Sequence, residues 1–308
     1  MDGSAGISPQ MAIASRMKLI VHPGLHKTGS TYLQHVLNDN HAALAAQGLW
    51  YQPQQGYPAH HHAAWRILLG DPAPLVAMVE NARKAGCHTL VLSSEDLEGA
   101  LYDDRPLAAI GAAAASADVS HIEWHVVLRE PGSAFASLYA QLQHHVYADA
   151  FQLFCDVMRR GFVHMAQPTP GHGTPYWYYA FDHLADLDRF QERADAPLFA
   201  HDFAHAAPFP GAGLLDHLGV LDALVTLPGR SARNARPAVD EIIRGFAERV
   251  EGAVPGDAEQ ARILDGFLTC MQNGLDNIET YAAIIGQRYA ESHAGALRCF
   301  APIQPAVA

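Results

Sequence analysis

The residues best suited to chemistry lie near the start of the chain, in the segment Gly24-Leu25-His26-Lys27-Thr28-Gly29-Ser30-Thr31. A glycine-containing loop between a strand and a helix offers several backbone N–H groups to a phosphate. The ATPase form of such a loop is G-x-x-x-x-G-K-[ST]. Here the two glycines and the final threonine keep that spacing, but Ser30 replaces the lysine, and Lys27 lies three positions earlier. The pattern therefore predicts a phosphate-like ligand different from that of an ATPase.

The side chains of this loop suit a sulfuryl group. Thr28, Ser30 and Thr31 offer hydroxyl donors, and Gly29 lets the backbone approach the anion. Lys27 can stabilise the negative charge that builds up on the oxygen joining a phosphate to its leaving group. A sulfuryl group carries less negative charge than a terminal phosphoryl group, so a metal ion is less necessary to neutralise it.

A second predicted anion site follows a later strand. Residues 121–128 are predicted to form a strand that ends in an apolar run, and they are followed by Arg129-Glu130-Pro131-Gly132-Ser133, with Ser137 one helical turn further on. An arginine at a strand end can direct two donors at one anion, and a hydroxyl on the next helix can join it. Two anion sites at neighbouring strand ends suit a ligand that is phosphorylated at both its 5′ and 3′ positions.

These two motifs resemble those of the sulfotransferase family that uses 3′-phosphoadenosine 5′-phosphosulfate (PAPS). The 5′-phosphosulfate loop of that family is similar to residues 22–34 here, and its 3′-phosphate motif is similar to residues 128–131 with Ser137-Leu138-Tyr139. The bacterial members carry an H-K-T-G-[ST]-[ST] loop. The resemblance extends over residues 18–240 and implies a P-loop NTPase-like fold.

The resemblance also implies site residues. PAPS would be held at its sulfate end by His26 through Thr31 and at its 3′-phosphate by Arg129 and Ser137. The family's late loop, which closes over the nucleotide, has its best counterpart in residues 230–236, with Arg233 and Arg236 as candidate contacts. This chain lacks the glycine-rich version of that loop found in cytosolic animal enzymes.

Sulfuryl transfer needs a base to take the proton of the acceptor, and Glu95 at the end of the strand 89–92 is our candidate. The family uses a glutamate or a histidine near this strand end, so a histidine is the alternative base. The run Ser94-Glu95-Asp96 could instead cap a helix. We expect four further residues to face the acceptor: His60, His62, Gln141 and His144. No metal is expected: the adjacent side chains of the run 60–62 diverge, and no nearby cysteine or H-x-x-x-H pair completes a set of ligands with these three histidines.

The elements that must position these residues are visible as apolar runs. Strands are predicted at 18–22, 89–92, 121–128 and 197–200. Helices are predicted at 30–46, 63–69, 74–85, 105–116, 131–145 and 237–250, and residues 148–192 are expected to be mainly helical, including the aromatic run 176–179. This alternation predicts an α/β three-layer sandwich with a central parallel sheet and ligands at the carboxyl ends of its strands. We expect one domain over 17–308, with additional C-terminal helices, and a flexible segment 1–16.

The composition argues against two classes of function, nucleic-acid binding and membrane spanning. A formal charge of −12 makes the surface a poor match for nucleic acid, and no apolar run is long enough to span a membrane. Four separated cysteines without C-x-x-C spacing, and no signal-type segment, indicate a cytoplasmic protein. The acceptor could be a carbohydrate, a lipid, a peptide or a small metabolite, and the oligomeric state is not defined. The alternatives are a Mg-dependent nucleotide kinase or NTPase and a catalytically silent nucleotide-binding protein.

Overall fold

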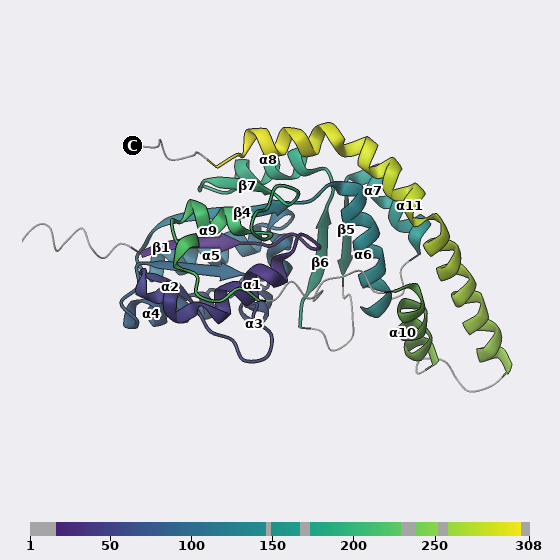
Figure 1. Cartoon of the computed structure of the whole chain (residues 1–308), viewed down its shortest axis with the longest axis horizontal. Coiled ribbons are helices and arrows are strands. Elements are labelled where there is room, and N and C mark those ends of the chain that lie inside the picture. The colour runs from purple at the N-terminus through teal and green to yellow at the C-terminus, as the bar shows by residue number, and fades with distance from the viewer. Residues whose placement is uncertain (1–16, 146–148, 167–172, 229–237, 252–257, 303–308) are drawn as a thin grey trace, which may run out of the picture.

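The computed structural model describes residues 17–145, 149–166, 173–228, 238–251 and 258–302. Its central sheet has five parallel strands in the order β2-β3-β1-β4-β7 (Figure 1). These strands are β1 (Met17–His22), β2 (Leu49–Tyr51), β3 (Thr89–Ser93), β4 (Val119–Leu128) and β7 (Leu198–Asp202). The four strands predicted from the sequence are confirmed, each end lying within two residues of its predicted position, and β2 is an addition.

Helices cover both faces of this sheet, as expected for an α/β protein. Leu19 and Val21 of β1 pack in the core on the side of α3 (His61–Leu68), α4 (Ala73–Lys84), α5 (Asp104–Ser116) and α8 (His183–Arg193). Ile20, which points the other way, packs with α1 (Ser30–Asp39), α2 (His41–Ala46) and α9 (Ala212–His217). Since both faces of the sheet are buried, the apolar residues of its strands do not follow a simple alternation, and polar residues such as Glu123 and His125 of β4 are buried among them.

The helix predicted over 30–46 is divided in two at Asn40. The Asn40 side chain donates to the carbonyl oxygen of Val36, and its Oδ1 accepts the N–H groups of Val225 and Thr226, each at 2.9 Å. Asn40 therefore ties this corner to a segment 185 residues away, and α1 and α2 form as separate helices.

The prediction that residues 148–192 are mainly helical is wrong for their central part. After α7 (Ala150–Arg160), strands β5 (Phe162–Ala166) and β6 (Tyr176–Ala180) form a separate antiparallel pair. The aromatic run 176–179 is thus a strand, in keeping with the high strand propensity of aromatic residues. All five residues of β6 are buried, so the alternation that would have indicated a strand is missing.

Helices from the C-terminal third pack against this hairpin region. They are α10 (Val239–Glu251), which confirms the helix predicted at 237–250, and α11 (Ala258–Cys299), which runs along α6 (Pro131–His145), α7 and α8 (Figure 1). Two glycines of α11 allow close approach: a Cβ at Gly274 would collide with Tyr139, and one at Gly286 with Glu130. Two short 3₁₀ helices, η2 (Glu95–Leu101) and η3 (Leu221–Ala223), complete the elements.

The strand order places the three predicted loops together. β1 lies between β3 and β4, and the chain passes from β3 on one side of β1 to β4 on the other. A crevice at the carboxyl ends of the strands is expected at such a reversal. Among the described residues, no helix is long and apolar enough to cross a bilayer.

Buried histidines should make the fold sensitive to acid. Burial lowers the pKa of His22 and His183 to about 3 and that of His60 to about 4. The unfolded chain therefore binds protons below about pH 6.5 that the folded chain does not, and stability falls as the pH falls. Asp186, whose pKa burial raises to about 7, and His26, whose pKa nearby carboxylates raise, act in the opposite direction but are fewer than the histidines whose pKa burial lowers.

We expect the Tm to fall steadily between pH 6.5 and 4, because the histidines with lowered pKa values take up protons in this range only when the chain unfolds. Calorimetry over this range measures the effect. His60→Gln, which keeps a side-chain donor for the Gln52 carbonyl oxygen, should show a shallower fall. A Tm that stays constant to pH 5 would contradict this prediction.

Candidate active site

The loop between β1 and α1 is a tight turn. Gly29, just before α1, has a φ of 81°, and Lys27 has a φ of 66°, in the left-handed region that non-glycine residues seldom enter. Gly24 lies so close to Ser30 that a Cβ at Gly24 would collide with the Ser30 hydroxyl. The turn brings the positive N-terminal end of α1 to the carboxyl edge of the sheet, where an anion can be bound.

The hydroxyl groups of this loop divide into two sets. Thr28 and Ser30 are each 3% exposed, and both donate to the carbonyl oxygen of Leu25. Their side chains therefore hold the loop in shape. The Thr31 hydroxyl instead points toward the next strand end and donates to Glu95 Oε1 at 3.1 Å. Lys27 and the backbone N–H groups are thus the main candidates for direct contact with an anion.

Arg129 joins the two predicted anion loops. From the end of β4 its Nη1 donates to the carbonyl oxygen of Lys27 at 2.9 Å, and its guanidinium lies 5.1 Å from the centre of the Phe203 ring. Its Nε donates to the Ser133 hydroxyl at 3.1 Å. Burial lowers the pKa of Arg129, with Glu130 partly offsetting this, but an arginine remains charged. A fixed positive charge therefore lies beside the first loop.

Arg129 contacts the hydroxyl of Ser133, whereas Ser137 stays a predicted contact of the 3′-phosphate. Ser137 lies one turn further along α6 and is partly exposed. Glu130 caps the start of this helix, because its two carboxylate oxygens accept the N–H groups of Gly132 and Ser133 at 2.8 and 2.7 Å. The run Glu-Pro-Gly-Ser is typical of a helix start and could have indicated Ser133.

Glu95 lies on the other side of the loop. Its Oε2 is 3.8 Å from His61 Nε2, and His61 Nδ1 is 2.9 Å from Asp96 Oδ2 and 2.9 Å from the Ser94 hydroxyl. Trp65 Nε1 also donates to Asp96. Burial raises the pKa of Asp96, but the hydrogen bonds and charge interactions with His61, His26 and Trp65 together outweigh this, and the pKa is lowered overall. Burial lowers the pKa of Lys27, and nearby Glu95 offsets part of that effect.

The three consecutive histidines have different environments. His60 is 2% exposed and is hydrogen-bonded to the Gln52 carbonyl oxygen and the Ser93 N–H, so it supports the fold. His61, which the sequence did not favour, is the one beside Glu95. His62 lines a pocket beside Glu95 that is described below. Because α3 begins at His61 and successive helical side chains point in different directions, only the position of the helix decides which histidine faces the site.

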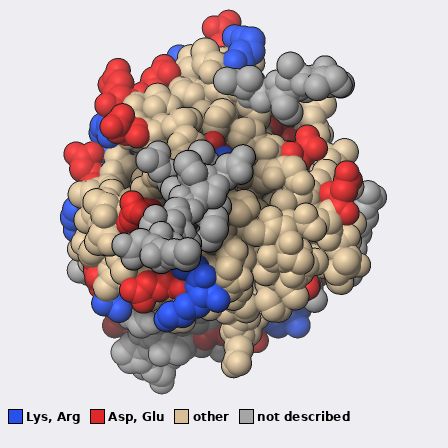
Figure 2. Space-filling model, turned by 90° about the vertical axis from the view of Figure 1, so that its left-hand side faces the viewer, with Lys and Arg blue, Asp and Glu red and all other residues tan. Residues whose placement is uncertain are grey.

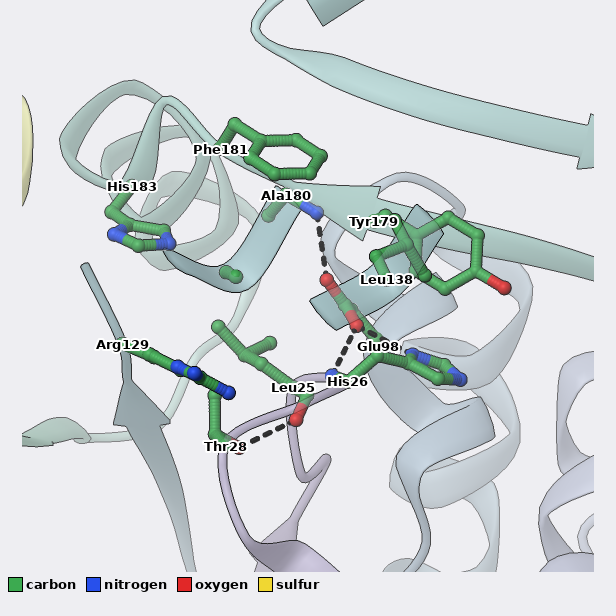
Figure 3. A pocket seen from close by; sticks show the side chains of 11 residues that line it. Leu25, His26, Thr28, Glu98, Arg129, Leu138, Tyr179, Ala180, Phe181 and His183 are labelled. Carbon is green, nitrogen blue, oxygen red and sulfur yellow. Dashed lines mark hydrogen bonds and ion pairs between the residues drawn. The ribbon is translucent and has the colours of Figure 1, made fainter. Parts of the chain in front are cut away.

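His26 is held in the loop by a buried carboxylate that sequence reasoning missed (Figure 3). Glu98 Oε2 accepts the backbone N–H of His26 at 2.8 Å and lies 2.7 Å from its Nδ1, while Oε1 accepts the Ala180 N–H at 2.7 Å. Burial disfavours the charged imidazole, but Glu98 outweighs it and raises the pKa of His26. A cavity of about 20 Å³ lies between this pair, Thr28 and Arg129, enough for a water molecule.

A larger pocket opens beside Glu95. Its volume is about 450 Å³, and it is lined by aromatic rings, amides and the two carboxylates: Tyr57, His61, His62, Trp65, Trp177, Gln54, Gln55, Gln141, Glu95 and Asp96. His26 also borders it, so the pocket adjoins the loop. The predicted acceptor residues His62 and Gln141 both lie here. The side chain of His144, and Arg233 and Arg236, fall outside the described part of the chain.

Charge is distributed unevenly over the molecule. Figure 2 shows the amino-end side of the sheet, where the visible basic side chains form small groups, several of them beside acidic ones. At the opposite edge Lys27 and Arg129 lie near carboxylates, Glu95 acting on Lys27 and Glu130 on Arg129, in a chain with a formal charge of −12. A few fixed cations and oriented N–H groups can bind an anion in an acidic protein.

Comparison of the chain with protein-family models, curated proteins and solved structures finds no match. The arguments about function therefore rest on this geometry.

Proposed function

We propose that this protein is a sulfotransferase that moves a sulfuryl group from PAPS to an acceptor hydroxyl or amine. The observation that carries the proposal is the contact of Arg129 with the Lys27 carbonyl oxygen. It joins two anion-binding loops from adjacent strands into one site with two cationic side chains. A nucleotide with a 5′-phosphosulfate and a 3′-phosphate needs two such centres close together.

We also infer that the sheet is of the P-loop NTPase-like type. β1 is central, its loop leads directly into α1, and β3 and β4 flank it. This arrangement supports nucleotide binding at the end of β1. It leaves Glu95 on the β3 side and Arg129 on the β4 side of the bound anion.

In the proposed reaction the acceptor enters the pocket of about 450 Å³ and attacks sulfur in line with the bridging oxygen. Glu95 takes the acceptor proton as the new sulfur–oxygen or sulfur–nitrogen bond forms. The bond from sulfur to the bridging oxygen breaks, and its electron pair stays on the 5′-phosphate. Lys27 and the loop N–H groups stabilise that charge, and 3′-phosphoadenosine 5′-phosphate (PAP) is released.

One observation favours the alternative of a Mg-dependent kinase or NTPase. Thr31 occupies the Ser/Thr position of the ATPase loop, and its hydroxyl contacts the carboxylate of Glu95. Such a hydroxyl and a nearby carboxylate hold Mg²⁺ in that class of enzyme. Against it, Ser30 stands at the lysine position.

A thermal-shift experiment separates the two functions. We expect PAP to raise the Tm in the presence of a metal chelator, and to do so more than adenosine 5′-phosphate, because only PAP engages both cationic centres. ATP with Mg²⁺ should give the smaller shift. Stabilisation by ATP with Mg²⁺ alone would overturn the proposal in favour of the kinase or NTPase.

The same experiment tests Arg129. Arg129→Lys keeps the charge but loses the forked donor geometry, and we expect PAP binding to weaken by roughly 10- to 100-fold, as for loss of a charged hydrogen bond. Binding of adenosine 5′-phosphate should change much less. Arg66→Lys, at an arginine whose side chain is 61% exposed, is the matched control. Equal losses for both nucleotides would assign Arg129 to the shape of the loop only.

A further inference from the structure

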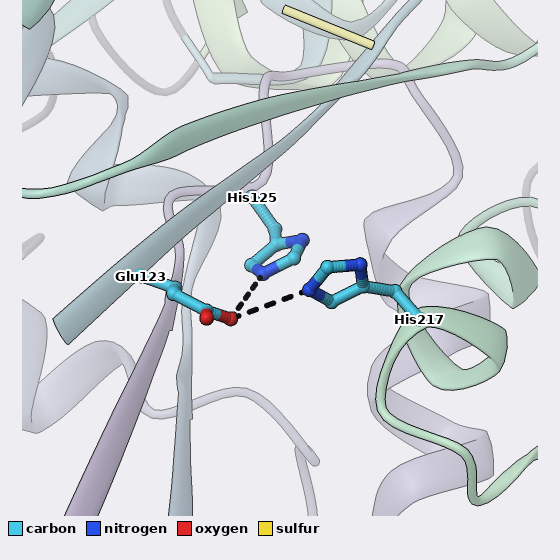
Figure 4. Close-up of side chains that lie close together, drawn as sticks. All are labelled: Glu123, His125 and His217. Atoms are coloured by element: carbon cyan, nitrogen blue, oxygen red, sulfur yellow. Dashed lines mark hydrogen bonds and ion pairs between the residues drawn. The ribbon is translucent and has the colours of Figure 1, made fainter. Parts of the chain in front are cut away.

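A second cluster of chemically active side chains lies away from the loops described above. Glu123 and His125 project from β4, and His217 ends α9, which covers that face of the sheet (Figure 4). Glu123 Oε2 lies 3.4 Å from His125 Nε2 and 3.4 Å from His217 Nε2. The three ligand atoms all lie within 4.8 Å of one another.

This cluster is distinct from the nucleotide site. Glu123 pairs with Ile20 in the middle of the sheet, whereas Arg129 follows the end of β4. Six residues of extended strand separate the two positions, which corresponds to about 20 Å. A ligand bound at Glu123 would therefore not touch the proposed PAPS site.

The geometry matches a tetrahedral metal centre. Metal–nitrogen and metal–oxygen bonds of about 2.0–2.2 Å place neighbouring ligands about 3.4 Å apart at the tetrahedral angle, which is the observed spacing of Glu123 from each histidine. The His217 side chain is 16% exposed, so it has room to close the distance to His125. Two imidazoles and one carboxylate leave a fourth position for water.

Surrounding groups orient the three side chains. Lys18 Nζ and His121 Nε2 lie 2.8 and 2.9 Å from the other carboxylate oxygen, Oε1 of Glu123, which leaves Oε2 directed at the histidines. His125 Nδ1 lies 3.0 Å from His201 Nε2. A metal-binding histidine usually has its second ring nitrogen hydrogen-bonded in this way, because that bond selects the tautomer.

We propose that Glu123, His125 and His217 bind one divalent transition-metal ion, with Zn²⁺ the best match to two imidazoles and a carboxylate. The ion links α9, a helix of six residues, to strand β4 of the central sheet. It joins positions 92 residues apart (217 − 125) and therefore stabilises the folded chain. The proposal is independent of the proposed sulfotransferase activity, and its test needs no substrate.

The test compares zinc binding by the whole protein and two ligand variants. Equilibrium dialysis with Zn²⁺, followed by elemental analysis, should give one ion more per chain for the wild type than for Glu123→Gln or His217→Asn. Zn²⁺ at 100 times its Kd should raise the wild-type Tm by about 5 °C, and this shift should disappear in both variants. Co²⁺ should show the visible absorption of a tetrahedral site in the wild type alone.

His205→Asn is the matched control, because the His205 side chain is 86% exposed and pairs with Asp202. It should bind zinc like the wild type. The Tm of each variant, measured in the presence of a chelator, shows whether that variant is folded. Two ligand variants are used so that the test still stands if one of them fails to fold. If the ligand variants bind as much zinc as the wild type, or if the wild type binds none, the cluster is an ion-pair network and the proposal is wrong.

Discussion

Replacing Lys27 with glycine should lower kcat by about 10²- to 10³-fold, the range measured for removal of one group that stabilises transition-state charge. Under the proposed mechanism its ammonium group acts on the oxygen that leaves with the 5′-phosphate. That charge is largest in the transition state, so nucleotide affinity should fall far less than kcat. The measurement is PAP release from PAPS with the best acceptor among a panel of phenols, sugars and amines.

Glycine is the informative replacement because Lys27 has a φ of 66°. A glycine adopts this left-handed conformation without strain, so the loop and the Tm should be preserved while the charge is lost. The control is Lys84→Ala, at an exposed position of α4. Lys84→Gly is less suitable, because glycine would weaken that helix. Unchanged kcat in Lys27→Gly would remove the role assigned to this side chain.

Replacing Glu95 with glutamine should lower kcat by about 10²- to 10⁴-fold, the usual contribution of a general base. The amide can still accept the hydrogen bond from Thr31, so the loop and PAP binding should remain. The loss should be smaller for an acidic phenol that is already ionised at the assay pH, because such an acceptor needs no base. Steady-state kinetics with alcohol and phenol acceptors measure both effects.

Glu80→Gln, at an exposed position of α4, is the matched control and should behave like the wild type. His61 is the alternative base, because its Nε2 lies 3.8 Å from Glu95 and it borders the same pocket. If Glu95→Gln keeps full activity and His61→Gln loses it, the base is the histidine. If neither variant loses activity, neither side chain is the base. If the wild type binds PAP but releases none from PAPS with any acceptor, the protein is a silent binding protein.

Much of the fold could be predicted because buried parallel strands carry a strong local signal. The predicted strands at 18–22, 89–92 and 121–128 became β1, β3 and β4 with small changes at their ends. The hairpin of β5 and β6 was missed because burial of every β6 residue removed the alternation that marks a strand. The break at Asn40 depends on carbonyl and N–H groups about 185 residues away, which no local pattern contains.

Part of the candidate site could be predicted because it too is marked by local sequence patterns. A glycine loop after a strand and an arginine at a strand end are local patterns, so the neighbourhood of Lys27 and Arg129 could be inferred from strand order. The buried partner Glu98 is 72 residues from His26, and only packing reveals it. Likewise, only the folded structure shows that Arg129 contacts the Ser133 hydroxyl.

The sequence by itself determined the parallel α/β architecture, the glycine-containing loop at residues 24–31 and the cationic strand end at Arg129. These features depend on residues close together in the chain, whose burial and backbone preferences are visible locally. Only the tertiary structure decided that Arg129 reaches Lys27 across 102 positions, that Thr31 meets Glu95, and that Glu123 faces two histidines. Those contacts arise from strand order and helix rotation, which are set by packing between distant segments.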